Sequence, residues 1–264
     1  MTGGKLEIAY GFILVAAACV LMTLCGLIAG KAFRALAEYR RKESARKLQP
    51  YFERLLARLV RTGALPKPEG RLSRTDREII LLKLTAWIER LSGPAREKLT
   101  ALCEELGFVD RELARLRSRR SLVRTRAAHR LGLIRSKRAA APLLEELRRE
   151  RFGPALFVLA RSLALCARGA DDLEAMVMQV IKHRKRTYEM TAAILEEADG
   201  DKREICGRLM QSGIPDAVRI ALICEGRFAE KPDKRSAGNV LSFREPAVRS
   251  GARKSAGGIG GGRA

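Results

Sequence analysis

The chain has 264 residues, with 52 lysines and arginines against 30 aspartates and glutamates and a formal net charge of +22. Aromatic residues make up only 5% of it, and leucine, alanine, arginine and glutamate dominate, which favours helices and argues against a β fold. The positive excess indicates anionic partners, such as lipid headgroups, nucleic acid or acidic protein surfaces. A genome that favours arginine over lysine would give the same excess, spread over solvated faces with no partner.

The first predicted element is an apolar helix from Ile8 to Ala29, which contains no charged residue. It exceeds the roughly 20 residues that a helix needs to cross a hydrocarbon core of about 30 Å. Because positively charged residues stay on the cytoplasmic side, we expect a single-pass anchor in the cell membrane with a cytoplasmic C-terminal body. The basic segment that sets this direction contains Lys31, Arg34, Arg40, Arg41, Lys42, Arg46 and Lys47.

Two alternatives to an uncleaved anchor fit the apolar helix less well. A signal peptide has a shorter apolar core and a small-residue cleavage site, which does not follow here. Ala16-Ala17-Ala18-Cys19 resembles a lipoprotein cleavage box, but the apolar run continues from Val20 to Ala29. We therefore expect the segment over 1–30 to remain as a transmembrane helix.

Gly26 and Gly30 form a G-x-x-x-G pair near the inner end of this helix. The spacing lets two spans approach closely, and it predicts a homodimer through pairing of the spans. Small residues are also common in unpaired spans, which is the alternative interpretation.

Helical periodicity continues through a basic juxtamembrane helix over 31–62, in which Pro50 is expected in the first turn of a new helix. Its positive charges would lie on anionic lipid or would only set the topology. After a loop rich in Gly and Pro, three short helices over 76–91, 94–106 and 110–116 are expected to form the N-terminal cap, 63–117, of the folded body.

The most informative stretch is Arg119 to Glu150, RRSLVRTRAAHRLGLIRSKRAAAPLLEELRRE. It resembles a HEAT repeat of the short bacterial kind, whose first helix reads V-R-x-x-A-A-x-x-L-G-x-I and whose second reads A-x-x-x-L-x-x-x-L. Ser136-Lys137 replace the aspartate usual in the turn of that family. The first helix is matched by Val123, Arg124, Ala127, Ala128, Leu131, Gly132 and Ile134, and the second by Ala140, Pro142, Leu143, Leu144 and Leu147.

The same shape recurs less regularly after residue 150. Helices are expected over 152–168 and 170–182, over 187–199 and 202–212, and over 215–227, which opens with D-x-V-R-x-A. A period of roughly 30–35 residues is typical of a helical solenoid. The expected fold is therefore all-α: an N-terminal transmembrane helix, then an α-solenoid of HEAT-like pairs over 118–228. A basic, Gly-rich tail over 229–264 is expected to be disordered.

No catalytic set stands out in the sequence, and we expect no cofactor, no metal and no enzymatic activity. His129 and His183 are far apart, and no phosphate-binding loop or nucleophile motif is present. The six cysteines form no C-x-x-C, which predicts buried thiols in a reducing compartment instead of a zinc site or disulfides. The enzymes of the phycobilin-lyase-like HEAT group would need a catalytic residue that this chain does not offer.

A dense run of arginines between Arg111 and Arg138 has Glu112 as its only acid. Helical geometry cannot bury all of these arginines, so they are expected to form a basic ridge at the edge of the solenoid. The ridge would bind phosphate, lipid or an acidic protein loop, unless it is simply a solvated face. The predicted contact residues are Arg119, Arg120, Arg126 and Arg130.

Two functions follow from these patterns. The first is a non-catalytic, membrane-anchored HEAT-repeat scaffold that binds a partner protein on the cytoplasmic face, because such arrays present extended surfaces for protein contact. The alternative is a basic α-solenoid that binds nucleic acid or anionic lipid through the ridge. Aromatic residues interleaved with the arginines, which single-stranded nucleic acid would favour, are not present.

Overall fold

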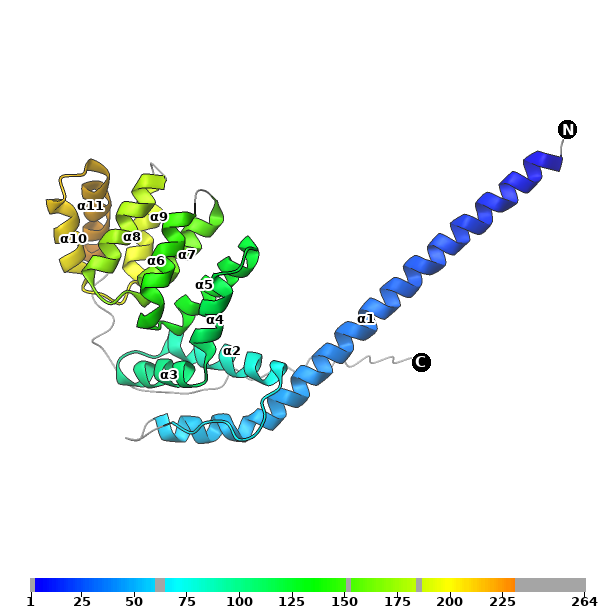
Figure 1. The fold of residues 1–264 in the computed structure, drawn as a ribbon, viewed down its shortest axis with the longest axis horizontal. Coiled ribbons are helices and arrows are strands. Elements are labelled where there is room, and N and C mark those ends of the chain that lie inside the picture. The colour runs from blue at the N-terminus through cyan, green and yellow to red at the C-terminus, as the bar shows by residue number, and fades with distance from the viewer. Residues whose placement is uncertain (1–2, 60–64, 151–152, 184–186, 231–264) are drawn as a thin grey trace, which may run out of the picture.

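The structure is a computed structural model that describes residues 3–59, 65–150, 153–183 and 187–230, and all regular secondary structure within these ranges is helical. The expected all-α class is therefore confirmed for the described part of the chain. The tail beyond residue 230 lies outside the described residues. Figure 1 shows one very long helix that extends away from a body of shorter helices.

The long helix, α1, runs from Gly3 to Leu59. It includes the apolar segment, and between Val20 and Ile28 its large apolar side chains are 51–78% exposed. Within the described residues it is the helix long and apolar enough to cross a membrane. The boundary expected between residues 30 and 31 falls inside this helix, so the apolar segment and the basic segment form one continuous element.

Pro50 lies inside α1, where the sequence suggested the start of a separate helix. A proline has no N–H to donate to the carbonyl one turn earlier, and its ring crowds that carbonyl, which bends a helix without necessarily ending it. Figure 1 shows α1 changing direction toward its C-terminal end. The buried residues on both sides of Pro50, Leu48 and Tyr51, hold the helix against the body through this region.

The C-terminal part of α1 is built into the core of the body. Its buried face packs on α2 (Arg74–Arg90), where Ile80, Leu84, Trp87 and Ile88 are buried. A capping box between Ser73 and Asp76 begins α2. The buried residues that α1 contributes are Leu48, Tyr51, Phe52, Leu55 and Leu59.

The remaining helices agree with the expected ranges to within a few residues. Gly93 precedes the helix that begins at Pro94, and Gly107 precedes the helix that begins at Phe108. Both glycines have positive φ angles, which glycine adopts without strain. The helices are α3 (Pro94–Glu105), α4 (Phe108–Leu116), α5 (Ser121–Ile134), the 3-10 turn η1 (Lys137–Ala139), α6 (Ala140–Arg149), α7 (Pro154–Cys166), α8 (Ala170–His183), α9 (Tyr188–Glu197), α10 (Lys202–Gln211) and α11 (Pro215–Glu230).

Helices in the body pack with a regular alternation. α5 packs on α7, α7 on α9 and α9 on α11, whereas α6 packs on α8 and α8 on α10. The first helix of each expected pair thus contacts the first helix of the next pair, and the second helices do the same. One buried apolar cluster runs through all of these helices and continues into α2 and α1.

Gly132 permits the close contact between α5 and α7. A Cβ atom at this position would lie 2.8 Å from both Cα and Oγ of Ser162, which is too close for any side chain. Because Cα of Ser162 belongs to the backbone, a larger residue would force the two helices apart. The glycine at position 132 therefore has a direct structural reason.

The turn after α5 is held by groups from distant helices. Arg135 adopts a left-handed conformation (φ 59°), and its Nη1 donates to Asp199 at 2.6 Å, while Arg96 of α3 donates to the same carboxylate at 2.9 Å. The buried Ser136 donates through Oγ to Glu104 of α3. Asp199 and two side chains of α3 thus hold this turn in place.

Candidate partner-binding groove

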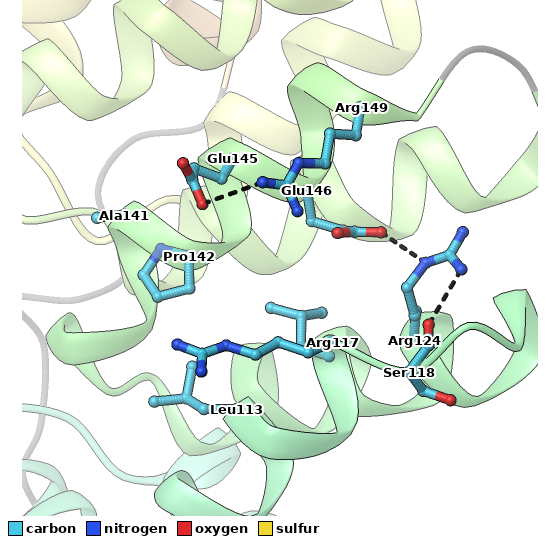
Figure 2. Close-up of a pocket in the computed structure, with 10 residues that line it drawn as sticks. Leu113, Arg117, Ser118, Arg124, Ala141, Pro142, Glu145, Glu146 and Arg149 are labelled. Atoms are coloured by element: carbon cyan, nitrogen blue, oxygen red, sulfur yellow. Dashed lines mark hydrogen bonds and ion pairs between the residues drawn. The ribbon is translucent and has the colours of Figure 1, made fainter.

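A groove of about 880 Å³ opens between the end of α4, the α4–α5 loop and α6. Apolar atoms of the α4 leucines and of two small residues on α6 line one part, and charged side chains line the rest (Figure 2). The lining residues are Leu113, Leu116, Arg117, Ser118, Arg124, Ala141, Pro142, Glu145, Glu146 and Arg149.

Arg124 of α5 fixes one side of the groove. Its Nη1 donates to the carbonyl oxygens of Ser118 at 3.2 Å and of Arg119 at 3.1 Å, so it holds the α4–α5 loop in place. Its Nε lies 2.5 Å from Oε1 of Glu146 (Figure 2). The two groups form an ion pair, but their geometry is not that of a hydrogen bond. The charge of Arg124 is therefore neutralised inside the protein, and this residue acts as a structural member of the wall.

The rim of the groove carries the accessible charge. Arg117 is exposed, and no carboxylate of the described residues pairs with it. Arg149 pairs with Glu145 at 3.8 Å, and both side chains are 69% exposed, so this pair is weak and exchangeable with solvent. The groove therefore presents an apolar strip beside two arginine side chains that are exposed to solvent.

Three of the four predicted ridge residues are accessible. Arg119 and Arg120 lie exposed in the α4–α5 loop next to the groove, and Arg126 is exposed on α5. No carboxylate within the described ranges forms an ion pair with them. The structure thus brings Arg119 and Arg120 together with Arg117 at one end of α5.

Arg130, the fourth predicted residue, is engaged inside the body. Its Nη1 lies 3.2 Å from Glu112 and its Nη2 lies 3.6 Å from Glu78. Glu112 is 2% exposed and also pairs with Arg115 at 3.0 Å. The single acid of the arginine-rich run therefore joins α4 to α5, and Arg130 contributes to packing more than to an accessible surface.

Gly26 and Gly30, the predicted pairing residues, follow each other by one turn on α1. A Cβ at either position would meet no atom within 4 Å, so this face of the helix is open in the single chain.

Several groove residues escaped the sequence analysis. Glu146 belongs to no motif, and its pairing with Arg124 joins residues of two helices. Arg117 belongs to the predicted run of arginines but was not among the four predicted contact residues. The available signal was the pattern of α6, where Ala141 and Pro142 are small or compact on the side that faces α4. Small residues at those positions leave the space that forms the groove.

The titratable groups with clearly shifted pKa values lie away from the groove. Burial raises the pKa of the Cys103 and Cys166 thiols to about 12. A hydrogen bond between Cys206 and Cys224 lowers the pKa of the first and raises that of the second. Among the described side chains, no three His, Cys, Asp or Glu residues are grouped so that they could hold a metal ion.

Comparisons of this chain with protein-family models, with curated proteins and with solved structures gave no match.

Proposed function

We propose that this protein is a non-catalytic scaffold that holds a partner protein at the cytoplasmic face of the cell membrane. The observation that carries the proposal is the continuity of α1, whose apolar part is exposed and whose C-terminal part is buried in the body. A flexible linker would tether the body loosely. One helix shared by anchor and core instead fixes the position of the body relative to the membrane.

The body supports a binding role as a solenoid of HEAT-like pairs. Its first helices contact one another in sequence, from α5 through α7 and α9 to α11, and its second helices do so from α6 to α10. Stacked pairs of this kind form long, stiff surfaces suited to protein contact. The orientation follows from the basic residues after the apolar segment, which favour a cytoplasmic body.

The groove beside α6 is the proposed binding site for the partner protein. Its apolar strip would accept an aliphatic side chain, and Arg117 and Arg149 would pair with acidic residues beside it. The partner segment is therefore expected to be acidic with an apolar anchor. Complementary charge would mainly raise the rate of encounter, and the apolar contact would supply most of the affinity.

The test is co-purification of the full chain from detergent-solubilised membranes of its own source. A stoichiometric protein should remain bound after nuclease treatment and at moderate salt. The double variant Arg117→Glu/Arg149→Glu should lose this protein, because it reverses both rim charges. The matched control, Arg90→Glu/Arg203→Glu, changes the net charge equally at exposed positions of α2 and α10 and should retain it.

Two results would contradict the proposal. One is release of the chain from membranes by an alkaline wash, which would show that α1 is not an integral anchor. The other is equal partner binding by the rim variant and the control variant, which would place the partner elsewhere.

Nucleic-acid binding is a second candidate function, favoured by the exposed and unneutralised guanidinium groups of Arg119, Arg120 and Arg126. It predicts DNA or RNA affinity that falls steeply with salt, because phosphate contacts release counterions. Affinity that is unchanged when these three residues become glutamate would exclude it.

A further inference from the structure

The tip of the α4–α5 hairpin, residues 117–122, combines exposed cations with one exposed aliphatic side chain. Arg117, Arg119 and Arg120 are exposed without a carboxylate partner in the described ranges, and the neighbouring Leu122 is 74% exposed. Arg124 holds the carbonyl groups of this loop, so the tip has a fixed shape. An exposed leucine beside arginines is well suited to the boundary between lipid headgroups and acyl chains.

The hairpin extends away from α3. Its opposite end is fixed there, since Thr100 of α3 donates to the carbonyl oxygen of Ile134 at 3.0 Å. Arg138 of η1 also pairs with Asp110 at the start of α4 at 2.8 Å. Residues 117–122 therefore form the free end. Figure 1 shows that α4 and α5 rise from α3 on the side of the body toward which α1 climbs to its N-terminus. The tip and the apolar segment of α1 thus extend toward the same side.

The lengths of the two elements are comparable. The part of α1 between Ala29 and Leu48, the first buried residue among the described side chains of this helix, is about 28 Å long at 1.5 Å per residue. The 14 residues of α5 span about 21 Å along their own axis. Arginine side chains and a headgroup layer several Å thick can close the remaining gap. Both lengths are of the order that a contact between the tip and the bilayer requires.

We propose that the α4–α5 hairpin tip is a second membrane contact, in which Arg119 and Arg120 bind the phosphates of anionic phospholipids and Leu122 enters the headgroup boundary. The inference rests on the proposed anchoring by α1. It goes beyond that anchoring, because a second contact at the tip would set the angle of the body on the membrane. Anionic lipids are enriched in the cytoplasmic leaflet, and guanidinium groups bind phosphate through paired donors. The groove, immediately beside the tip, would then be presented close to the membrane surface.

The experiment places an environment-sensitive fluorophore at the tip of the full chain reconstituted in vesicles. Leu122→Cys is labelled in a Cys19→Ala/Cys25→Ala background, in which the other thiols are buried. The matched control is Leu222→Cys on α11, also an exposed leucine (58%). Vesicles contain phosphatidylcholine alone or with a quarter of phosphatidylglycerol, and lipids with a nitroxide near the headgroup serve as quenchers.

The probe at position 122 should shift to the blue and be quenched in the anionic vesicles only, and the probe at position 222 should remain in water in both. Arg119→Glu/Arg120→Glu should abolish the quenching, whereas Arg90→Glu/Arg203→Glu should leave it intact. With the native sequence, amide exchange over 117–126 should slow in anionic bilayers, with no change in α10 and α11.

In a chain that an alkaline wash does not release from the membrane, three outcomes would overturn the inference about the tip and leave the proposed anchoring by α1 intact. They are no quenching at position 122, equal quenching in neutral vesicles, and quenching that survives Arg119→Glu/Arg120→Glu. Duplex DNA binding that is lost in the same variant, without bilayer contact, would assign these arginines to nucleic acid. A chain that the alkaline wash releases would refute the proposed function itself.

Discussion

Phe52 of α1 meets Trp87 of α2 edge to face, with ring centroids 5.7 Å apart and an interplanar angle of 83°. Tyr51 lies beside Phe52 at a centroid distance of 5.5 Å. This geometry places the positive edge of one ring against the negative face of another and adds to the burial of apolar area. The contact joins the long helix to the body, so it determines whether the two parts move together.

Phe52→Ala should lower the free energy of unfolding of the body by about 3–5 kcal/mol, because it removes a buried ring and leaves a cavity. Urea unfolding of the full chain in detergent, followed by the fluorescence of Trp87, the single tryptophan, measures this change. Phe33→Ala is the control on the same helix, since Phe33 is 75% exposed. Equal losses in both variants would show that α1 does not pack on α2 as described.

Gly132→Ala should destabilise the body by about 1–3 kcal/mol, because the added Cβ would meet the backbone of Ser162 and separate α5 from α7. Gly226→Ala on α11 meets no atom within 4 Å and should instead stabilise its helix by up to about 1 kcal/mol. Thermal unfolding of the two variants compares them directly. A neutral Gly132→Ala would contradict the close crossing.

Local sequence signals predicted the helices well, because apolar spacing and Gly or Pro boundaries act over a few residues. The range expected for α10 was 202–212, and the helix ends at Gln211. Pro50 is the exception: its local effect is to disfavour the helix, but burial of Tyr51 and Phe52 on the body keeps α1 continuous. Tertiary packing determines whether the helix continues past Pro50, and the residues next to Pro50 in the sequence do not reveal that packing.

The candidate site was predictable only in its charge. The sequence indicated a cluster of arginines, yet it could not show that Arg130 is neutralised by Glu112, 18 positions earlier, while Arg119 and Arg120 remain accessible. Which arginine finds a carboxylate depends on how α4 and α5 pack. The groove has the same origin, because it is the space that two non-consecutive helices leave between them.

The capping box of α2 should make stability fall in acid. Burial would raise the pKa of Asp76, but hydrogen bonds from the hydroxyl and backbone of Ser73, with smaller effects of Ser44 and Lys47, outweigh burial and lower the pKa below 3.8. A lowered folded-state pKa stabilises the fold above the unfolded-state value, and the contribution is lost as the pH falls through the folded-state value. Asp76→Asn should therefore flatten the decline of stability below about pH 4.

Urea unfolding between neutral pH and about pH 3 measures this slope. Ser73→Ala should cost about 1 kcal/mol at neutral pH, since the N–H of Asp76 loses its acceptor, 3.0 Å away. An acid slope in Asp76→Asn as steep as that of the unmodified chain would assign the effect to other carboxylates.

The carboxylate of Asp199 should be important because it pairs with two arginines, from α3 and from the turn after α5. All three side chains are 16–22% exposed. Asp199→Asn leaves two partly buried cations without a counter-charge and should cost about 1–3 kcal/mol, less than for a fully buried pair. Asp110→Asn, which breaks the exposed pair with Arg138, should cost at most about 1 kcal/mol. Chemical denaturation that gives equal costs would contradict the role of Asp199 as a link.

The buried thiols should be inert in the folded chain. The pKa values of Cys103 and Cys166 are raised to about 12, so almost no thiolate exists near pH 8, and both side chains are at most 1% exposed. Iodoacetamide should therefore modify them only after a denaturant is added, as peptide mass spectrometry would show. Leu82→Cys, at a position 67% exposed on α2, is the positive control and should react at once. Rapid modification of Cys103 in the native chain would mean that α3 separates readily from the core, which would contradict the packing that joins α1, α2 and α3.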